Sequence, residues 1–338
     1  MSISGEDLTF VIQGPVHHDS SCATIDTAAS IKRHFPDGRI VLSTWKGEET
    51  SGLDVDEIVL NDDPGPVVSV LDGLEIVNNI NRQIVSTAAG LARAETPYAA
   101  KVRSDALLTG TGFRSLFEAF PLRGQEGLVF ERRVVVSKEF TRSVRSFVPM
   151  AYHPGDLFQF GLSEDLRSYW DLPTLQGEAL AAFLLDEPPA VWYRMFDRFR
   201  HTTEQHLFLS MLRRSGIEVE HANYATIGPN TPLLSERLLF ENFIPAEAHV
   251  LGVRHPKFEG RAQRSLADDC LGIREFASWY VSNAVGLPSD EVLGGTAPAL
   301  SATLKTERVA REALKRSSLM RSLYAGRFLE RGARNRTP

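Results

Sequence analysis

The sequence has little cysteine: Cys22 and Cys270 are the only two thiols among 338 residues. Two cysteines so far apart supply neither a disulfide framework nor the four ligands of a structural zinc site. A disulfide-stapled secreted domain is therefore not expected, and a reducing cytosol is the default location.

Long apolar segments are also missing. No stretch approaches the ~18 uninterrupted apolar residues of a membrane-spanning helix. The segment from Met1 to Asp7 lacks the basic and apolar regions of a secretory signal. We therefore expect any membrane contact to be peripheral, with the protein in the cytoplasm or on the inner face of the cytoplasmic membrane.

Positive charge is not in excess: 37 Lys and Arg against 43 Asp and Glu give a net charge of -6, which argues against a general nucleic-acid-binding protein. The charge is unevenly distributed, because the segment from Lys305 to Arg336 holds ten basic and three acidic residues. This tail therefore carries +7 and the remainder -13. Leucines among these bases predict an amphipathic helix over residues 300–338, which would lie on an anionic membrane surface or pack against the rest of the chain.

Short β-branched segments alternate with segments of helical periodicity in the first 105 residues. The expected strands are 8–12, 40–44, 55–60 and 96–105, and the expected helices are 24–35 and 79–94. A Gly/Pro/Val loop is expected before the second helix. This alternation predicts an α/β fold with a mostly parallel, Rossmann-type sheet flanked by helices.

The second half is less regular. We expect strands within 127–136 and 218–226, helices at 162–170 and 203–214, and a Gly/Pro-rich linker at 286–298.

Polar residues gather at the expected carboxyl ends of the strands, where ligands bind in such sheets. They are Gln13-Gly14, Asn61-Asp62-Asp63 and Arg103-Ser104-Asp105. The segment from Lys101 to Asp105 delivers a lysine, an arginine and an aspartate at a strand exit, which suits a phosphorylated ligand bridged by a metal. The alternative is a surface strand end at which Arg103 and Asp105 pair locally.

Five segments occur in one order and spacing: Phe10-Val-Ile-Gln-Gly-Pro15, Ile40-Val-Leu-Ser-Thr-Trp45, Asn61-Asp-Asp-Pro-Gly65, Asn79-Ile-Asn-Arg-Gln83 and Lys101-Val-Arg-Ser-Asp105. Together they resemble the WavE lipopolysaccharide synthesis family. The resemblance covers residues 8–260, and no segment is specific without the others. It implies a glycosyltransferase-like protein of the GT-A type, acting in lipopolysaccharide or capsule assembly.

By this resemblance, Arg103-Ser104-Asp105 occupies the place of the Asp-x-Asp motif, whose carboxylates hold a divalent cation against the diphosphate of a nucleotide sugar. Asp105 would then bind Mg²⁺ or Mn²⁺. The sequence departs from the motif at Arg103, which could instead pair directly with a phosphate without metal.

The resemblance also implies contacts to the donor at the other strand ends and at the start of the second helix. The residues expected to bind the nucleotide sugar are Gln13, Gly14, Pro15, Asp62, Asn79, Arg82, Gln83, Lys101 and Arg103. Ordinary turn chemistry is the alternative for Gln13-Gly14-Pro15 and for Asp62, and exposed helix residues need no function.

Two carboxylates are candidates for the base that takes the proton from the acceptor hydroxyl in an inverting reaction. Asp156 lies in His153-Pro-Gly-Asp156, which resembles a second family signature, and Glu204 opens a predicted helix. Helix capping or loop structure is the alternative for Asp156, and stabilisation of the first helical turn is the alternative for Glu204. The sequence does not choose between them.

Histidines and a small basic cluster are interpreted structurally. His17, His18 and His201 lack spaced metal-binding partners and are interpreted as loop histidines. Arg254-His255-Pro256-Lys257 is interpreted as an exposed basic loop, although it could close over a diphosphate.

The expected organisation is a catalytic domain at 1–260, with a nucleotide-sugar half (1–110) and an acceptor half (111–260), a helix and linker at 261–298 and the tail at 299–338. The expected partners are a nucleotide-sugar donor, a glycan or glycolipid acceptor and an anionic membrane surface, with no nucleic acid. The alternatives are a sugar-phosphate nucleotidyltransferase, which lacks support because no Gly-rich basic loop occurs near residue 14, and a noncatalytic membrane-associated scaffold.

Overall fold

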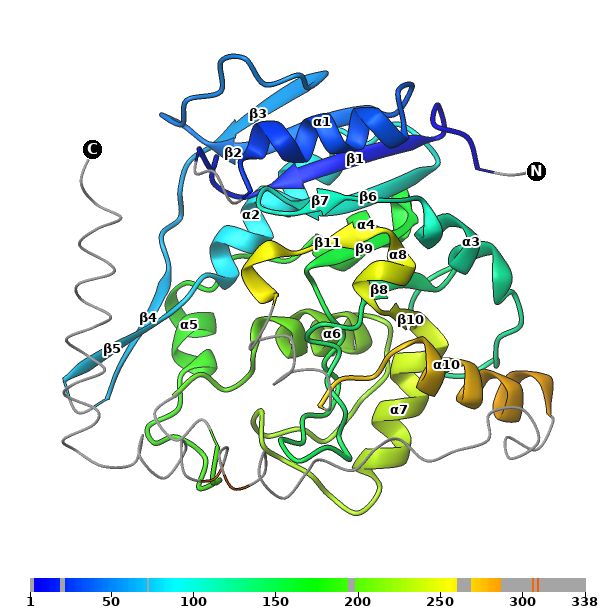
Figure 1. Ribbon diagram of the computed structural model, residues 1–338. Helices are drawn as coiled ribbons and strands as arrows, with labels where there is room; N and C mark the ends of the chain where they lie inside the picture. The colour runs from blue at the N-terminus through cyan, green and yellow to red at the C-terminus, as the bar shows by residue number, and fades with distance from the viewer. Residues whose placement is uncertain are drawn as a thin grey trace.

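A seven-stranded sheet forms the centre of the protein (Figure 1). The computed structural model describes residues 3–18, 22–71, 73–193, 198–259 and 269–286, together with Thr306 and Val309. None of the helices in these ranges is long and apolar enough to cross a bilayer.

The strand order is β10-β8-β9-β6-β1-β2-β3. Only β9 runs antiparallel to its neighbours β6 and β8, and the other pairs are parallel. The strands are β1 (Leu8–Gln13), β2 (Arg39–Trp45), β3 (Glu57–Asn61), β6 (Tyr98–Arg103), β8 (Val134–Ser137), β9 (Phe158–Leu162) and β10 (Phe243–Ala246). This mostly parallel sheet with flanking helices is a GT-A-like fold.

Helices cover both faces of the sheet. Alternate residues of β1 point to opposite faces and therefore contact helices of both layers. Phe10 packs with Phe113 of α3 and with Phe35, which follows α1. Val11 faces α2, where a Cβ on Gly90 would lie only 2.3 Å from its Cγ1. The four flanking helices are α1 (Thr24–His34), α2 (Ile80–Leu91), α3 (Gly112–Ala119) and α4 (Ser163–Trp170).

The remaining elements surround the β10 end and the lower half of the molecule (Figure 1). They are α5 (Gly177–Phe183), α6 (Thr203–Arg214), α7 (Thr231–Asn242), α8 (Ala248–Leu251), the 3₁₀ turn η1 (Pro256–Phe258), α10 (Ile273–Tyr280) and the π-helical turn η2 (Val281–Val285). A two-stranded sheet pairs β7 (Leu107–Leu108) with β11 (Val253–Arg254).

The alternation predicted for the first 105 residues is confirmed, with one error. The expected loop before α2 contains a hairpin of β4 (Val67–Leu71) and β5 (Leu74–Asn78). The turn residues Pro64, Gly65 and Gly73 flank these strands, and turn residues close to short valine segments favour a loop in the sequence.

The second half follows the prediction less closely. The helices at 162–170 and 203–214 are confirmed as α4 and α6, and β8 accounts for the strand within 127–136. The strand predicted at 218–226 is wrong, because this segment bonds to loops: the Tyr224 amide donates to the Arg200 carbonyl at 2.7 Å. The predicted linker, from residue 287 on, and the tail lie outside the described residues, apart from Thr306 and Val309.

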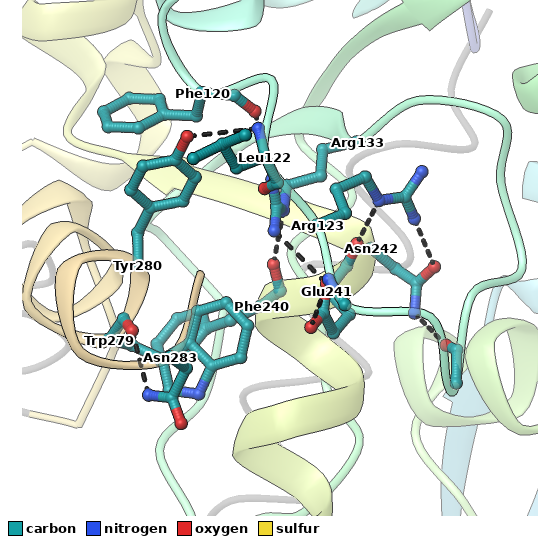
Figure 2. Close-up of polar contacts among 12 residues, drawn as sticks. Phe120, Leu122, Arg123, Arg133, Phe240, Glu241, Asn242, Trp279, Tyr280 and Asn283 are labelled. Atoms are coloured by element: carbon teal, nitrogen blue, oxygen red, sulfur yellow. Dashed lines mark hydrogen bonds and ion pairs between the residues drawn. The ribbon is translucent and has the colours of Figure 1, made fainter. Parts of the chain in front are cut away.

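A buried ion pair holds α10 against the β10 end of the sheet (Figure 2). Arg133, with a side chain 1% exposed, lies 3.2 Å from the carboxylate of Glu241. It also donates to the carbonyls of Phe120, Leu122 and Phe240. Its guanidinium carbon lies 5.5 Å from the ring centroids of Phe276 and Tyr280 and 6.0 Å from that of Trp279. The pair therefore joins three segments that are distant in the sequence.

Replacing Arg133→Met leaves the carboxylate of Glu241 buried without its cation, so we expect a loss of roughly 3–5 kcal/mol in the free energy of unfolding. Urea unfolding followed by circular dichroism measures it. Arg237→Met is the control, because the Arg237–Glu126 pair is 49% and 82% exposed and should contribute less than about 1 kcal/mol. Equal losses in the two variants would contradict this role.

Candidate active site

The carboxyl ends of β1 and β6 lie side by side at one edge of the sheet. The register places Gln13 opposite Arg103. Gly14 follows with φ +118°, and a Cβ at this position would lie 3.0 Å from the Ser104 hydroxyl. Glycine therefore provides both the left-handed conformation and the space that the two strand ends need.

The segment after β6 is held by α1. The hydroxyls of Thr24 and Thr27 both donate to the Ser104 carbonyl at 3.1 Å. These bonds fix the backbone between Arg103 and Asp105, which gives the two charged side chains a rigid base.

Arg103 and Asp105 form a two-pronged ion pair, with Nε–Oδ1 at 2.8 Å and Nη2–Oδ2 at 2.9 Å. The side chains are 22% and 16% exposed, so the local pair expected as an alternative exists but is not a surface feature. Burial acts to raise the pKa of Asp105, but the hydrogen bonds and charge of Arg103 bring it down to about 2. The carboxylate is therefore ionised at neutral pH. Nη1 of Arg103 has no hydrogen bond to any described residue.

Lys101 is fully buried and donates to the Asp156 carbonyl, with the Asp156 carboxylate 3.8 Å from its ammonium. The two meet because β9 runs antiparallel to β6, so the chain just before β9 returns beside the carboxyl end of β6. Burial lowers the pKa of Lys101 to about 8. Burial also raises the pKa of Asp156, Lys101 opposes this rise and Glu204 adds to it.

Glu204 lies in the first turn of α6, which begins with a capping box between Thr202 and Gln205. Its carboxylate lies 3.6 Å from Nε2 of His153, and the side chains are 14% and 3% exposed. Nδ1 of His153 lies 2.7 Å from the Phe140 carbonyl, which fixes the ring. The structure therefore brings both base candidates, Asp156 and Glu204, into one group of charges.

Helix α2 contributes at the same edge, because the hydroxyl of Ser86, in its second turn, donates to the Gln13 side chain at 2.9 Å. Arg82 makes two bonds to Asp63, at 2.7 and 2.6 Å, and one to the Asn79 side chain at 3.2 Å. Arg82 is therefore oriented by its neighbours.

The other predicted donor-site residues differ in exposure. Asp62 pairs with Lys46 at 2.8 Å, but the two side chains are 85% and 61% exposed. Pro15 is exposed, whereas Oε1 of Gln83 is buried with no hydrogen bond to the described residues. Lys101, Arg103, Asp105, Asp156 and Glu204 therefore lie close together at this edge, whereas Asp62 and Pro15 are exposed beside it.

His255 lies among these charges and was missed as a site residue. The exposed-loop interpretation holds for Arg254 and Lys257 but is wrong for His255, which is 6% exposed. Burial lowers its pKa to about 4, and the charges of Arg103 and Asp105 contribute with opposite sign. Its Nε2 is buried without a hydrogen-bond partner in the described ranges. Strand alternation through Val253 and Arg254 would have placed it inward.

A complete metal site of protein ligands is not present in the ranges that the structure describes: no three His, Cys, Asp or Glu side chains come together suitably. Mg²⁺ usually takes one or two protein carboxylates and completes its shell with phosphate oxygens and water. A carboxylate has about four lone-pair positions, so Asp105 keeps free positions beside Arg103. The residues therefore fit a cation shared with a phosphorylated ligand.

The profile of the WavE lipopolysaccharide synthesis family matches residues 8–293. The chain belongs to the WavE family. This confirms the resemblance on which the sequence-based expectations depend, and it connects the protein with lipopolysaccharide synthesis. No curated protein matches the chain.

Behind the site of this WavE protein lies a group of histidines in and beside α6. His201 lies in the loop before α6, as interpreted from the sequence, but it is 4% exposed and stacks on His221 with ring centroids 5.4 Å apart. Burial lowers the pKa of His201 to about 3 and those of His206 and His221 to about 4. All three rings are therefore neutral in the native state at neutral pH.

These histidines predict acid sensitivity. Below pH ~6.5 the histidines of the unfolded chain bind protons, whereas the buried rings of the native state stay neutral. The free energy of unfolding therefore falls as the pH drops from about 6.5 toward 4. At pH 5 each ring costs up to about 2 kcal/mol. Denaturant unfolding at pH 7 and pH 5 measures the loss.

His201→Gln should reduce this pH-dependent loss, whereas His18→Gln, at an exposed position, should not. Equal stability of the wild type at the two pH values would contradict the prediction.

Proposed function

We propose that this protein is a GT-A-type glycosyltransferase. It would move a sugar from a nucleotide-sugar donor to a hydroxyl of a lipopolysaccharide-core or capsular acceptor. The observation that carries the proposal is the grouping of basic and acidic side chains at one edge of the sheet. Arg103, Asp105 and His255 lie there with Asp156 and Glu204, and their charges shift one another's pKa.

The diphosphate end of the donor would bind at Arg103 and Asp105. Nη1 of Arg103 is available to a phosphate oxygen, and an arginine fork suits such a partner. Asp105 would hold Mg²⁺ or Mn²⁺, with the unpartnered Nε2 of His255 beside it. The cation, when bound, would neutralise the charge that develops on the leaving diphosphate. Arg82, which is anchored by Asp63, would add positive charge from α2.

The base of an inverting reaction would be Glu204 rather than Asp156. Asp156 is the counter-ion of a lysine with no exposed surface, so protonating it would leave a buried ammonium unpaired. Glu204 is more exposed, at 14%, and lies beside an oriented imidazole. His153 would therefore orient Glu204 while it accepts the proton.

Donor hydrolysis and transfer, measured with a panel of common nucleotide sugars, test the phosphate site. Asp105→Asn should weaken Mn²⁺-dependent activity by about 10²-fold or more, since a charged ligand is lost. Arg103→Lys should raise the KM for the donor, because the fork is lost. Glu126→Gln, at an 82% exposed position, is the control. Unchanged nucleotide binding in Asp105→Ala, with no activity toward any donor in the wild type, would refute the proposal.

The two carboxylates are separated by paired substitutions. Glu204→Gln should lower kcat by about 10²–10⁴-fold with little change in donor affinity, as expected for loss of a general base. Asp156→Asn should instead lower the denaturation midpoint, since it removes the counter-ion of Lys101. Stability and single-turnover rates are measured on both. The reverse pattern would assign the base to Asp156.

A further inference from the structure

The hairpin of β4 and β5 exposes an apolar face. Val68, Val70 and Val77 are 41%, 48% and 53% exposed. The register places Val68 opposite Val77 and Val70 opposite Glu75, which is also exposed. The alternate residue Val67 is 3% exposed. One face of the hairpin therefore packs on the protein, while the other presents three valines and a carboxylate.

This face lies in an acidic part of the chain. Residues 47–81 contain nine Asp or Glu and no Lys or Arg. Four of these acids, Asp56, Glu57, Asp62 and Asp63, pair with bases from elsewhere. Glu75 makes no ion pair with any described residue. A two-stranded hairpin has little stability of its own, and exposed apolar sheet faces commonly mark a binding surface.

The C-terminal segment, residues 299–338, has the complementary chemistry. It carries a net charge of +7, and Val309, Met320 and Leu323 are spaced so that they would share one face of a helix. Thr306 and Val309, its described residues, are helical, and Val309 is 50% exposed. An amphipathic helix of this kind needs an apolar surface with negative charge around it.

The connection is long enough. Figure 1 shows α10 and the hairpin on opposite sides of the molecule. The 18 residues from 287 to 304 can span roughly 60 Å when extended. A domain of this size has a diameter on the order of 50 Å. The segment can therefore reach the hairpin from Gly286.

We propose that residues 305–338 dock as an amphipathic helix on the exposed face of the β4–β5 hairpin. The apolar face of this helix would cover Val68, Val70 and Val77, and the bases would face Glu75 and the acidic residues around it. Covalent linkage gives the segment a high effective concentration at this face. An anionic membrane would attract the tail but repel the remainder of the chain, which carries -13. The hairpin leads directly into Asn79 and α2, so the docked segment would lie next to the candidate site.

Disulfide trapping in the full-length chain tests the contact directly. Both native cysteines are free and buried, so disulfides are expected to form mainly between the introduced thiols. Val77→Cys would be combined with single cysteines at successive positions from Ala310 to Met320. The control series carries Leu233→Cys, at a 71% exposed position on α7.

The expected result is an intramolecular disulfide that forms several-fold faster with Val77→Cys than with the control, with helical periodicity along the tail. Equal rates in the two series would overturn the proposal. Disulfides between molecules in place of internal ones would also overturn it, because a second copy would then supply the helix.

Vesicle binding gives a second measurement that does not depend on the trapping. Replacing Val68→Lys and Val77→Lys together on this exposed face should release the tail and strengthen flotation with phosphatidylglycerol vesicles several-fold over wild type. Phosphatidylcholine vesicles and Leu233→Lys are the controls. Equal flotation of wild type and double variant would mean that the tail is not held by the hairpin, and the proposal would fail. Neither experiment measures sugar transfer, so their outcome is independent of the proposed function.

Discussion

A lysine with no exposed surface constrains the whole edge of this sheet. Lys101 is the fourth residue of a central strand, and an ammonium in such a place must be neutralised and hydrogen-bonded. Asp156 provides both interactions, through its carbonyl and its carboxylate, and the ring of Trp170 lies 5.1 Å from the ammonium. These contacts require β9 to return antiparallel beside β6. The one reversed strand in the sheet and the charged group at its edge are therefore parts of one arrangement.

The charged side chains at this edge of the sheet form acid–base pairs. Arg103 is matched by Asp105, Arg82 by Asp63 and Lys101 by Asp156. Each pair joins a residue in or next to a strand or helix to a carboxylate in a neighbouring loop. The basic side chains are therefore held in fixed positions and are each paired with an acid. In the proposed complex a phosphate would bind beside such carboxylates, because phosphate and carboxylate oxygens are both hydrogen-bond acceptors.

The first half of the fold could be predicted because its elements are regular. Strands β1, β2 and β6 are continuous buried segments, and parallel neighbours bring their carboxyl ends together whatever lies between them. Gln13 and Arg103 were therefore placed at one edge correctly from the sequence. The hairpin at 67–78 was missed because short valine segments between turn residues are compatible with either a strand or a loop.

The remainder of the site depends on long-range packing that no local pattern records. His255 is brought inward by the pairing of β11 with β7, and His153 by the segment around Phe140. The Arg133–Glu241 pair likewise joins segments more than 100 residues apart. Such contacts cannot be predicted from the spacing of residues along the chain. They follow from the order in which the strands pair.

The proposed function requires that this edge of the sheet binds the diphosphate of a nucleotide sugar. Isothermal titration calorimetry of the full-length protein with nucleoside mono-, di- and triphosphates, in Mn²⁺ and in EDTA, tests it most directly. We expect the diphosphate to bind most tightly and Mn²⁺ to strengthen its binding. A preference for the triphosphate, or no binding of any nucleotide, would contradict it.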